Sequence, residues 1–143
     1  MNRRTSKRLS RQLVEAAGYG SAARVVELIR AGADPGGRNA DGTTALYAAS
    51  VQGNPGGVRA LLGHGADPNA HSGGPTDGTP LCAAACWGHV ETVRALLAGG
   101  ADPGLREDDG QGPSPLEWAV REEHEDVARL LRETLSTTAV GGA

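Results

Sequence analysis

The sequence predicts an all-α solenoid in which helix-turn-helix units, joined by short turns and finger loops, stack side by side. The tetrapeptide GADP occurs at 32–35, 65–68 and 100–103, so it returns after 33 and then 35 residues. The match extends further, because the segment 53–68 lies over the segment 88–103 at a constant shift. Glycine is abundant, at 22 residues, without a collagen-like period, which indicates many turns. A repeat of this length is typical of stacked helical units.

Four units cover most of the chain, with boundaries at about 11–42, 43–77, 78–112 and 113–135. One unit cannot bury its apolar face alone, whereas stacked units can. We expect residues 1–10 to form a basic, flexible N-terminal arm and residues 136–143 to form a flexible tail.

The first helix of each unit is predicted from its start and stop signals. A hydroxyl residue followed by proline occurs at 79–80 and 114–115, which supplies an N-cap and then a proline whose missing N–H costs nothing. Gly88 lies where this helix should end. The side chains expected to face the neighbouring units are Leu81, Ala84 and Ala85.

The second helix of the third unit should bury Val93, Leu96 and Leu97 and end at Gly100. Asp-Gly pairs at 41–42, 77–78 and 109–110 then make tight turns. The second unit differs, because residues 54–57 read NPGG. Each glycine inside a helix costs up to about 1 kcal/mol relative to alanine. We therefore predict that this helix is short or frayed and starts near Val58.

The end units should carry polar outer faces. Leu62 and Leu97 align with Arg132 in the last unit, and Ala60 and Ala95 align with Glu27 in the first. These substitutions are the end caps that a stack requires.

The chain resembles the ankyrin repeat family. The segment GTPLCAAACWGHVETVRALLAGGADP at 78–103 follows the family pattern G-x-T-P-L-H-x-A-A-x-x-G-H, a second helix, then G-A-D. The resemblance covers about 125 of the 143 residues. The chain departs from the family at the histidine of T-P-L-H, so the hydrogen bond of that histidine to the turn does not carry over. The residues in its place are Val14, Tyr47, Cys82 and Glu117.

Cys82, Cys86 and His89 could form a metal clamp, a redox pair or a nucleophile with its base. In the repeat register both cysteines lie on a first helix, and His89 lies at the inter-helix turn, where the family commonly has histidine. A structural zinc site needs four ligands, and only three candidates are near. We interpret the three as packing residues and expect no catalytic residue, metal or cofactor. A thiol- or metal-dependent enzyme remains the alternative.

Other chemical signals are weak. The acidic runs at 107–109 and 122–126 are interpreted as solvated surface, and no glycine-rich phosphate loop with a following Lys-Ser/Thr is present. No apolar run is long enough to cross a bilayer, and the start lacks the apolar stretch of a secretory signal. Two cysteines without such a signal indicate free thiols. We expect a cytoplasmic monomer that contacts no membrane.

The charge is uneven. Residues 1–40 hold eight Arg or Lys and three acids, whereas residues 101–143 hold four Arg and ten acids. The basic arm could bind nucleic acid through phosphates. It has no aromatic residue to stack on bases, and we favour a solubilising role.

The resemblance implies a non-enzymatic protein–protein interaction module without a small-molecule substrate, because ankyrin repeats mostly bind proteins. The implied surface is the concave groove formed by the finger loops and the ends of the first helices. We single out Trp87, because tryptophan is enriched in binding hot spots, although it could also pack over the next repeat. Trp118 is expected to pack. The candidate partner-binding residues at the helix ends are Trp87, Cys86, Tyr19, Val51, Gln52, Arg121 and Glu122, and those in the loops are Arg38, Asn39, Asp41, His71, Asp77, Arg106 and Asp108.

Overall fold

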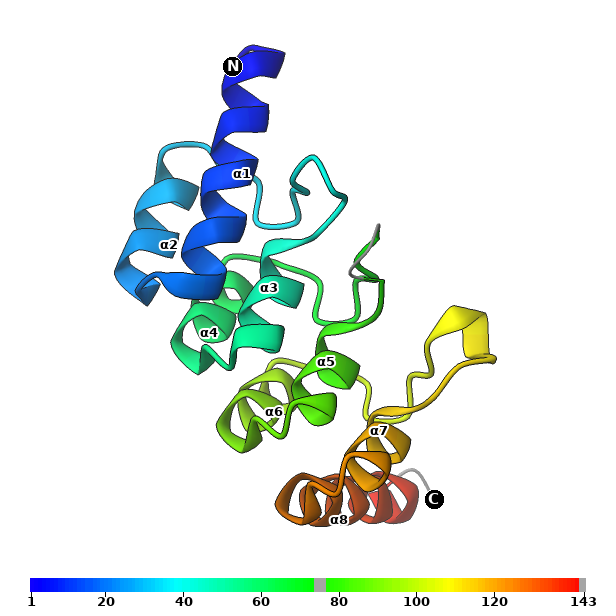
Figure 1. The fold of residues 1–143 in the computed structure, drawn as a ribbon. Helices are drawn as coiled ribbons and strands as arrows, with labels where there is room; N and C mark the ends of the chain where they lie inside the picture. Colours follow the sequence, from blue (N-terminus) through cyan, green and yellow to red (C-terminus); the bar gives the residue numbers. More distant parts are fainter. Residues whose placement is uncertain (74–76, 142–143) are drawn as a thin grey trace.

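The computed structural model describes residues 1–73 and 77–141, and its helices form an all-α stack (Figure 1). This confirms the predicted fold class. The helices form two layers. The inner helices are α1 (Arg3–Tyr19), α3 (Ala45–Gln52), α5 (Pro80–Cys86) and α7 (Pro115–Arg121). The outer helices are α2 (Ala22–Arg30), α4 (Pro55–Gly63), α6 (Val90–Ala98) and α8 (Glu125–Gly141).

Each inner helix contacts the next inner helix, and each outer helix contacts the next outer helix. The two ends of the chain therefore lie at opposite ends of the stack (Figure 1). The loops that lead from each outer helix to the next inner helix project from the same edge. We call these the finger loops; they cover residues 31–44, 64–79 and 99–114, of which 74–76 lie outside the described residues.

Hydroxyl side chains cap three of the inner helices, two of them at the predicted residues Thr79 and Ser114. The side-chain oxygens of Thr44, Thr79 and Ser114 accept hydrogen bonds from the backbone N–H three residues ahead. Pro80 and Pro115 occupy the first helical position, where no N–H is needed. The start of each repeat is thus determined locally, before any tertiary contact.

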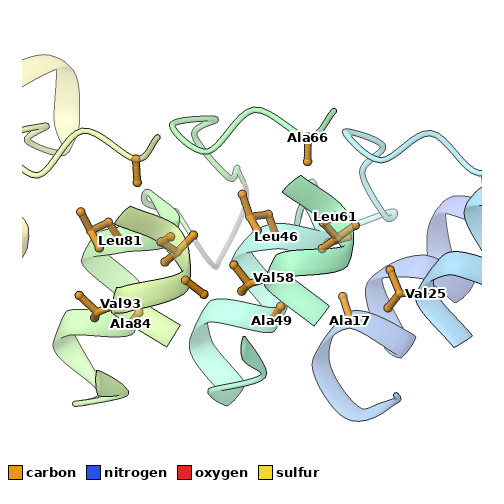
Figure 2. Packing of buried hydrophobic residues seen from close by; sticks show 14 of the residues in the cluster. Ala17, Val25, Leu46, Ala49, Val58, Leu61, Ala66, Leu81, Ala84 and Val93 are labelled. Carbon is orange, nitrogen blue, oxygen red and sulfur yellow. The ribbon is translucent and has the colours of Figure 1, made fainter. Parts of the chain in front are cut away.

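The core is built from small and aliphatic side chains (Figure 2). Ala49, Ala84 and Ala119 occupy equivalent positions in successive inner helices and are fully buried, which lets these helices approach closely. Leucines fill the equivalent outer-helix position and are also buried: Leu28, Leu61, Leu96 and Leu131. At the ends of the stack, Glu27 and Arg132 are exposed, as the end-cap prediction requires.

The prediction that the second helix of repeat two starts near Val58 is wrong. α4 begins at Pro55 and has nine residues, the same number as α6. Asn54 explains the difference, because its Oδ1 accepts from the N–H of Gly57 at 3.1 Å and caps the helix. Gly57 lies so close to the Asn54 side chain that an added Cβ would be 2.7 Å from its Nδ2.

Both chain ends are helical in the structure, at residues where the sequence predicted a flexible arm and tail. Residues 3–10 form the first turns of α1, which Asn2 caps by accepting from the N–H of Thr5. Leu9 and Ser10 are buried in the stack. At the other end, α8 continues to Gly141, and residues 142–143 lie outside the described residues.

Candidate functional site

A cavity of about 360 Å³ opens between α5, α7 and the finger loops that precede them. Three aromatic side chains line it, from Tyr47, Trp87 and Trp118. The whole chain contains two Trp, two Tyr and no Phe, so this cavity gathers three of its four aromatic residues. Three carboxylates also line it, from Asp77, Glu107 and Asp108, and the described lining includes no basic side chain.

Trp87 lies at the rim of this cavity. It is the C-cap residue of α5, and Gly88 follows it with a φ of +73°, which turns the chain away from the helix. The indole is consequently left uncovered, with 61% of the residue exposed. Trp87 therefore does not pack over the neighbouring repeat, which was the alternative considered from the sequence.

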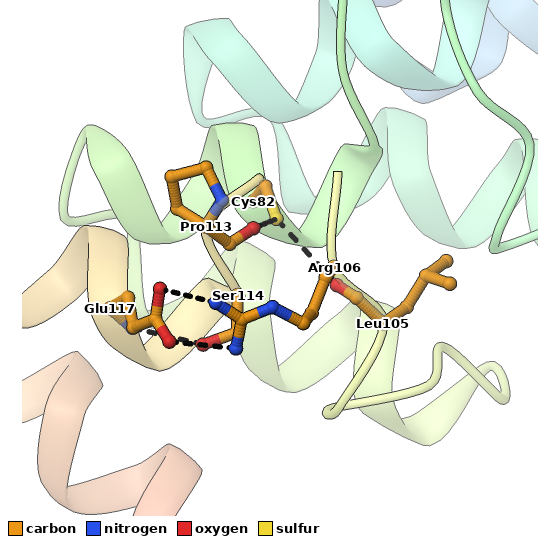
Figure 3. Close-up of polar contacts among 6 residues, drawn as sticks. All are labelled: Cys82, Leu105, Arg106, Pro113, Ser114 and Glu117. Atoms are coloured by element: carbon orange, nitrogen blue, oxygen red, sulfur yellow. Dashed lines mark hydrogen bonds and ion pairs between the residues drawn. The ribbon is translucent and has the colours of Figure 1, made fainter. Parts of the chain in front are cut away.

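Cys82 also lines the cavity. It is buried, and its Sγ lies 3.7 Å from the carbonyl oxygen of Pro113 and 3.9 Å from that of Leu105, both in the third finger loop (Figure 3). One S–H can donate weakly to either carbonyl, so the thiol gives the loop a weak polar contact. Burial raises the pKa of the Cys82 thiol to about 12.

Burial and the carboxylates around the cavity also raise the pKa values of Tyr47 and Cys86. Burial raises the pKa of the Tyr47 hydroxyl, and the Glu107 carboxylate raises it further. Burial also raises the pKa of the half-buried Cys86 thiol, and the charges of Glu122 and Glu107 add to that shift. Both thiols are therefore held in their protonated form.

Glu107 and Trp118 join the third finger loop to α7. The indole Nε1–H of Trp118 donates to Oε1 of Glu107 at 2.5 Å. Trp118 is half-buried against the hydrophobic core, as expected from the sequence, and the guanidinium carbon of Arg121 lies 5.0 Å from the centre of its ring. Glu107 is half-buried too, so the interpretation of the whole run 107–109 as solvated surface was wrong at its first residue.

Arg106 and Glu117 form the exposed counterpart of this contact (Figure 3). The two guanidinium nitrogens lie 2.7 and 2.9 Å from the two carboxylate oxygens. The hydrogen bond from Arg106 holds the pKa of Glu117 below its ordinary value, and the backbone N–H of Glu117 in turn donates to Ser114. Glu117 stands at the family's histidine position, so a salt bridge links helix and loop at this position.

His89 does not join the two cysteines. Its Nε2 lies 2.9 Å from the carbonyl oxygen of Val51 in the previous repeat, and His124 repeats the contact with the carbonyl oxygen of Cys86 at 3.0 Å. Both residues thus act as links between repeats. Among the described residues, no three or more His, Cys, Asp and Glu side chains are grouped so that they could hold a metal ion.

The sequence itself shows the family to which this stack belongs. It matches the family model described as ankyrin repeats (3 copies) over residues 13–107 and again over 69–139. The chain belongs to the ankyrin repeat family. No protein in the curated set matches it significantly. None of the described helices is long and apolar enough to cross a membrane.

In this ankyrin repeat protein, the predicted site residues fall into separate groups. Four of them line the cavity between α5 and α7: Trp87, Cys86, Asp77 and Asp108. His71 and Arg106 line an adjacent cavity of about 810 Å³ between the second and third finger loops, which Asp77 and Asp108 also border. Arg38, Asn39 and Asp41 lie in a third cavity at the first finger loop.

The remaining predicted residues lie outside these cavities. Tyr19 is 82% exposed, and its hydroxyl accepts a hydrogen bond from Nε2 of Gln52 at 3.1 Å. Val51 is half-buried, and Arg121 and Glu122 are exposed. Six cavity-lining residues were absent from the predicted set: Tyr47, Cys82, Ala83, Glu107, Pro113 and Trp118. The first two stand at the family's histidine position, and that departure was the available signal.

Several finger-loop residues hold the loops in place. Arg38 donates to the carbonyl oxygen of His71 at 2.8 Å and so links the first loop to the second. Oδ1 of Asn39 accepts from the N–H groups of Asp41 and Thr43. Nδ1 of His71 lies 3.1 Å from the carboxylate of Asp77. Ankyrin repeats are generally protein–protein interaction modules, and these contacts give the loop edge of this one a defined shape.

Proposed function

We propose that this ankyrin repeat protein is a non-enzymatic interaction module that binds a partner protein through its concave groove and finger loops. One observation carries the proposal. Trp87, at the end of an inner helix, lines the same cavity as Asp77 and Asp108, which come from two successive finger loops. Helix ends and loops thus form one surface, and its exposed tryptophan is of the residue type most enriched in binding hot spots.

The loops that border this surface are already ordered by contacts within the chain. Arg38 holds the second finger loop through His71, and Arg106 holds the third through Glu117. A surface whose shape exists before binding loses less conformational entropy when the partner arrives. We further propose that the protein acts as a monomer in the cytoplasm. Cys82 and Cys86 are free thiols.

Affinity capture with matched variants tests the proposal. Wild-type protein, Trp87→Ala and Arg94→Ala are immobilised, incubated with extract of the native cells, and the bound proteins are quantified by mass spectrometry. Arg94 is an exposed residue of the outer helix α6, so its variant is the control for surface truncation. We expect a protein retained by wild type and Arg94→Ala and lost with Trp87→Ala.

The captured protein is then purified and titrated calorimetrically. If Trp87 is a hot spot, its replacement by alanine should lower the affinity about 30-fold or more, which corresponds to roughly 2 kcal/mol. Circular dichroism must show that Trp87→Ala keeps its helical fold. Equal capture by all three proteins would place the interaction elsewhere and contradict the proposal.

Two observations favour this function over a thiol-dependent enzyme. The reactive form of a cysteine is the thiolate, whereas the raised pKa values of Cys82 and Cys86 keep both as thiols at neutral pH. The expected base, His89, has its Nε2 at the carbonyl of Val51. A catalytic pair instead needs the base within hydrogen-bond reach of the nucleophile.

The nucleic-acid alternative keeps one observation in its favour. A cavity of about 710 Å³ lies between α1 and the first finger loop, and its basic lining residues are Arg4, Lys7, Arg8, Arg11 and Arg38. Filter binding of single-stranded RNA tests it, because phosphate contacts weaken steeply with salt. Salt-dependent binding that disappears in Arg4→Ala/Arg8→Ala would support it. Both side chains are exposed, so this variant leaves the buried Leu9 in place.

A further inference from the structure

We propose that the cavity between α5 and α7 takes one cationic side chain, of arginine or lysine, from an extended segment of the partner protein. The inference rests on the proposed function and names the chemistry of the partner. The guest's aliphatic stem lies against Tyr47 and Trp87, and its charged end lies at Glu107 and Asp108. The cavity suits a basic group because its lining combines aromatic rings with carboxylates.

Charge complementarity is the first argument. Asp77, Glu107 and Asp108 line the cavity, and no basic residue is among its described lining. Arg106, the basic residue of the third finger loop, is engaged by Glu117 through both guanidinium nitrogens, so it does not neutralise Glu107 by an ion pair. An anionic or neutral guest would leave the charges of Glu107 and Asp108 without a cation, whereas a basic side chain balances them.

The aromatic walls are the second argument. Aromatic rings attract a cation through their quadrupole, tryptophan most strongly, and Tyr47, Trp87 and Trp118 all line the cavity. The chain itself provides an instance, since Arg121 places its guanidinium 5.0 Å from the centre of the Trp118 ring. Long basic side chains also bury their methylene groups along such apolar surface.

The electrostatics and the size agree with this guest. Besides burial, the negative charge of Glu107 contributes to the raised pKa values of three residues that line the cavity, Tyr47, Cys82 and Cys86. A volume of about 360 Å³ lies at the lower end of the roughly 300–1,000 Å³ usual for small-ligand sites. The cavity therefore suits a single long side chain and is too small for a helix.

Nuclear magnetic resonance offers a direct test, because both tryptophans of the chain line the cavity. The ¹⁵N-labelled protein has two indole Nε1–H signals, which Trp87→Phe assigns. N-acetyl-arginine amide is titrated against N-acetyl-citrulline amide, a neutral molecule of almost the same shape. We expect saturable shifts of both indole signals with the arginine compound. The citrulline compound should bind at least about tenfold more weakly, because one charge interaction is lost.

Glu107→Gln is the decisive variant. It keeps an oxygen that can accept from the Trp118 indole but removes the charge, so the loop contact persists. Glu91→Gln, an exposed acid on α6, is the control with the same change in net charge. We expect affinity for N-acetyl-arginine amide to fall about tenfold in Glu107→Gln and to stay unchanged in Glu91→Gln, with the wild-type affinity weakened by added salt.

Three results would overturn the inference. They are shifts of equal size with arginine and citrulline, no saturable shift with N-acetyl-arginine amide, and unchanged binding in Glu107→Gln. A second copy of the chain could also supply the cation from its basic α1. Self-association by analytical ultracentrifugation that disappears in Glu107→Gln would therefore overturn the assignment to a partner protein. The proposed function has a separate readout. Capture of a partner by the wild type and its loss with Trp87→Ala are measured without N-acetyl-arginine amide, so they can succeed even if this compound does not bind.

Discussion

Nε2 of His89, in the third repeat, lies 2.9 Å from the carbonyl oxygen of Val51, in the second. A carbonyl only accepts, so Nε2 carries the proton and donates. The ring fits because Gly53 adopts a φ of +68° beside it, and an added Cβ there would lie 2.6 Å from Nδ1 of His89. Gly88 and His124 repeat the same arrangement one repeat later. Glycine and histidine thus form one device that joins successive repeats.

This device predicts coupled effects of substitution. His89→Ala leaves the Val51 carbonyl without its partner and should destabilise the fold by about 1–3 kcal/mol. Gly53→Ala should also destabilise, because a non-glycine residue at positive φ costs about 1–2 kcal/mol and its Cβ meets the ring. In the double variant the steric part disappears, so the two losses should not add. Urea unfolding of the four proteins measures the coupling, and strict additivity would contradict this account.

Gly56 and Gly57 should respond oppositely to alanine, although both lie in the first turn of α4. A Cβ at Gly56 would meet the Cβ of Ala22 at 3.6 Å and Oδ1 of Asn54 at 3.8 Å, both ordinary contacts, whereas a Cβ at Gly57 would be 2.7 Å from Nδ2 of Asn54. Gly56→Ala should stabilise by about 0.5–1 kcal/mol through helix propensity. Gly57→Ala should destabilise, because it displaces the side chain that caps the helix and bonds Ala17.

Thermal or urea unfolding of the two single variants measures this pair, and each is the control for the other. Stabilisation by both alanines would mean that helix propensity alone decides the start of α4. The side chain of Asn54 would then not require the glycine beside it.

The start of α4 also shows where sequence reasoning was sufficient and where it failed. The repeat register placed α5 and α7 correctly, because Thr79 and Ser114 carry local capping signals. The two glycines were counted only as helix breakers. Their context lies in another repeat, since Nδ2 of Asn54 donates to the carbonyl oxygens of Ala17 and Gly20. Sequence propensity does not contain such a contact.

The helix in the basic segment at the start was not predicted, for a similar reason. Its Arg and Lys residues dominate the composition, but the face of a helix depends on few positions per turn. Leu9 and Leu13 lie four residues apart and are both buried, so they extend the apolar face of α1 toward its start. Counting charge over residues 1–10 concealed that spacing.

The cavity was even harder to predict. Its helix side could be inferred, because the repeat register placed Cys86 and Trp87 at a helix end. Its loop side depends on a turn in which Asp108 and Asp109 adopt φ values of 48° and 53°, next to Glu107, which accepts from Trp118. A short acidic run has many solvated conformations, and only the structure shows which one directs Glu107 inward.

The Arg106–Glu117 salt bridge should affect ionisation more than stability. Both side chains are nearly half exposed, and exposed pairs contribute little to folding because solvent and salt screen them. We expect Arg106→Ala to raise the pKa of Glu117 toward its ordinary value and to leave the melting temperature almost unchanged. A carbon-detected titration of the glutamate carboxyls measures the pKa. Arg94→Ala, which removes an exposed arginine from α6, should leave that pKa unchanged.

Cys82 should make the fold sensitive to alkaline pH. Burial raises the pKa of its thiol from 9.0 to about 12 in the folded protein, so above pH 9 the unfolded chain loses a proton that the folded chain keeps. The associated stability is fully present below pH 9 and is lost as the pH rises toward 12. The slope approaches about 1.4 kcal/mol per pH unit for one proton.

Urea unfolding between pH 8 and pH 11 should therefore show falling stability in the wild type and a slope smaller by about one proton in Cys82→Ala. Cys86→Ala, at a half-buried thiol, is the matched control and should retain most of the slope. An equal slope in the wild type and in Cys82→Ala would show that folding does not raise the pKa of this thiol.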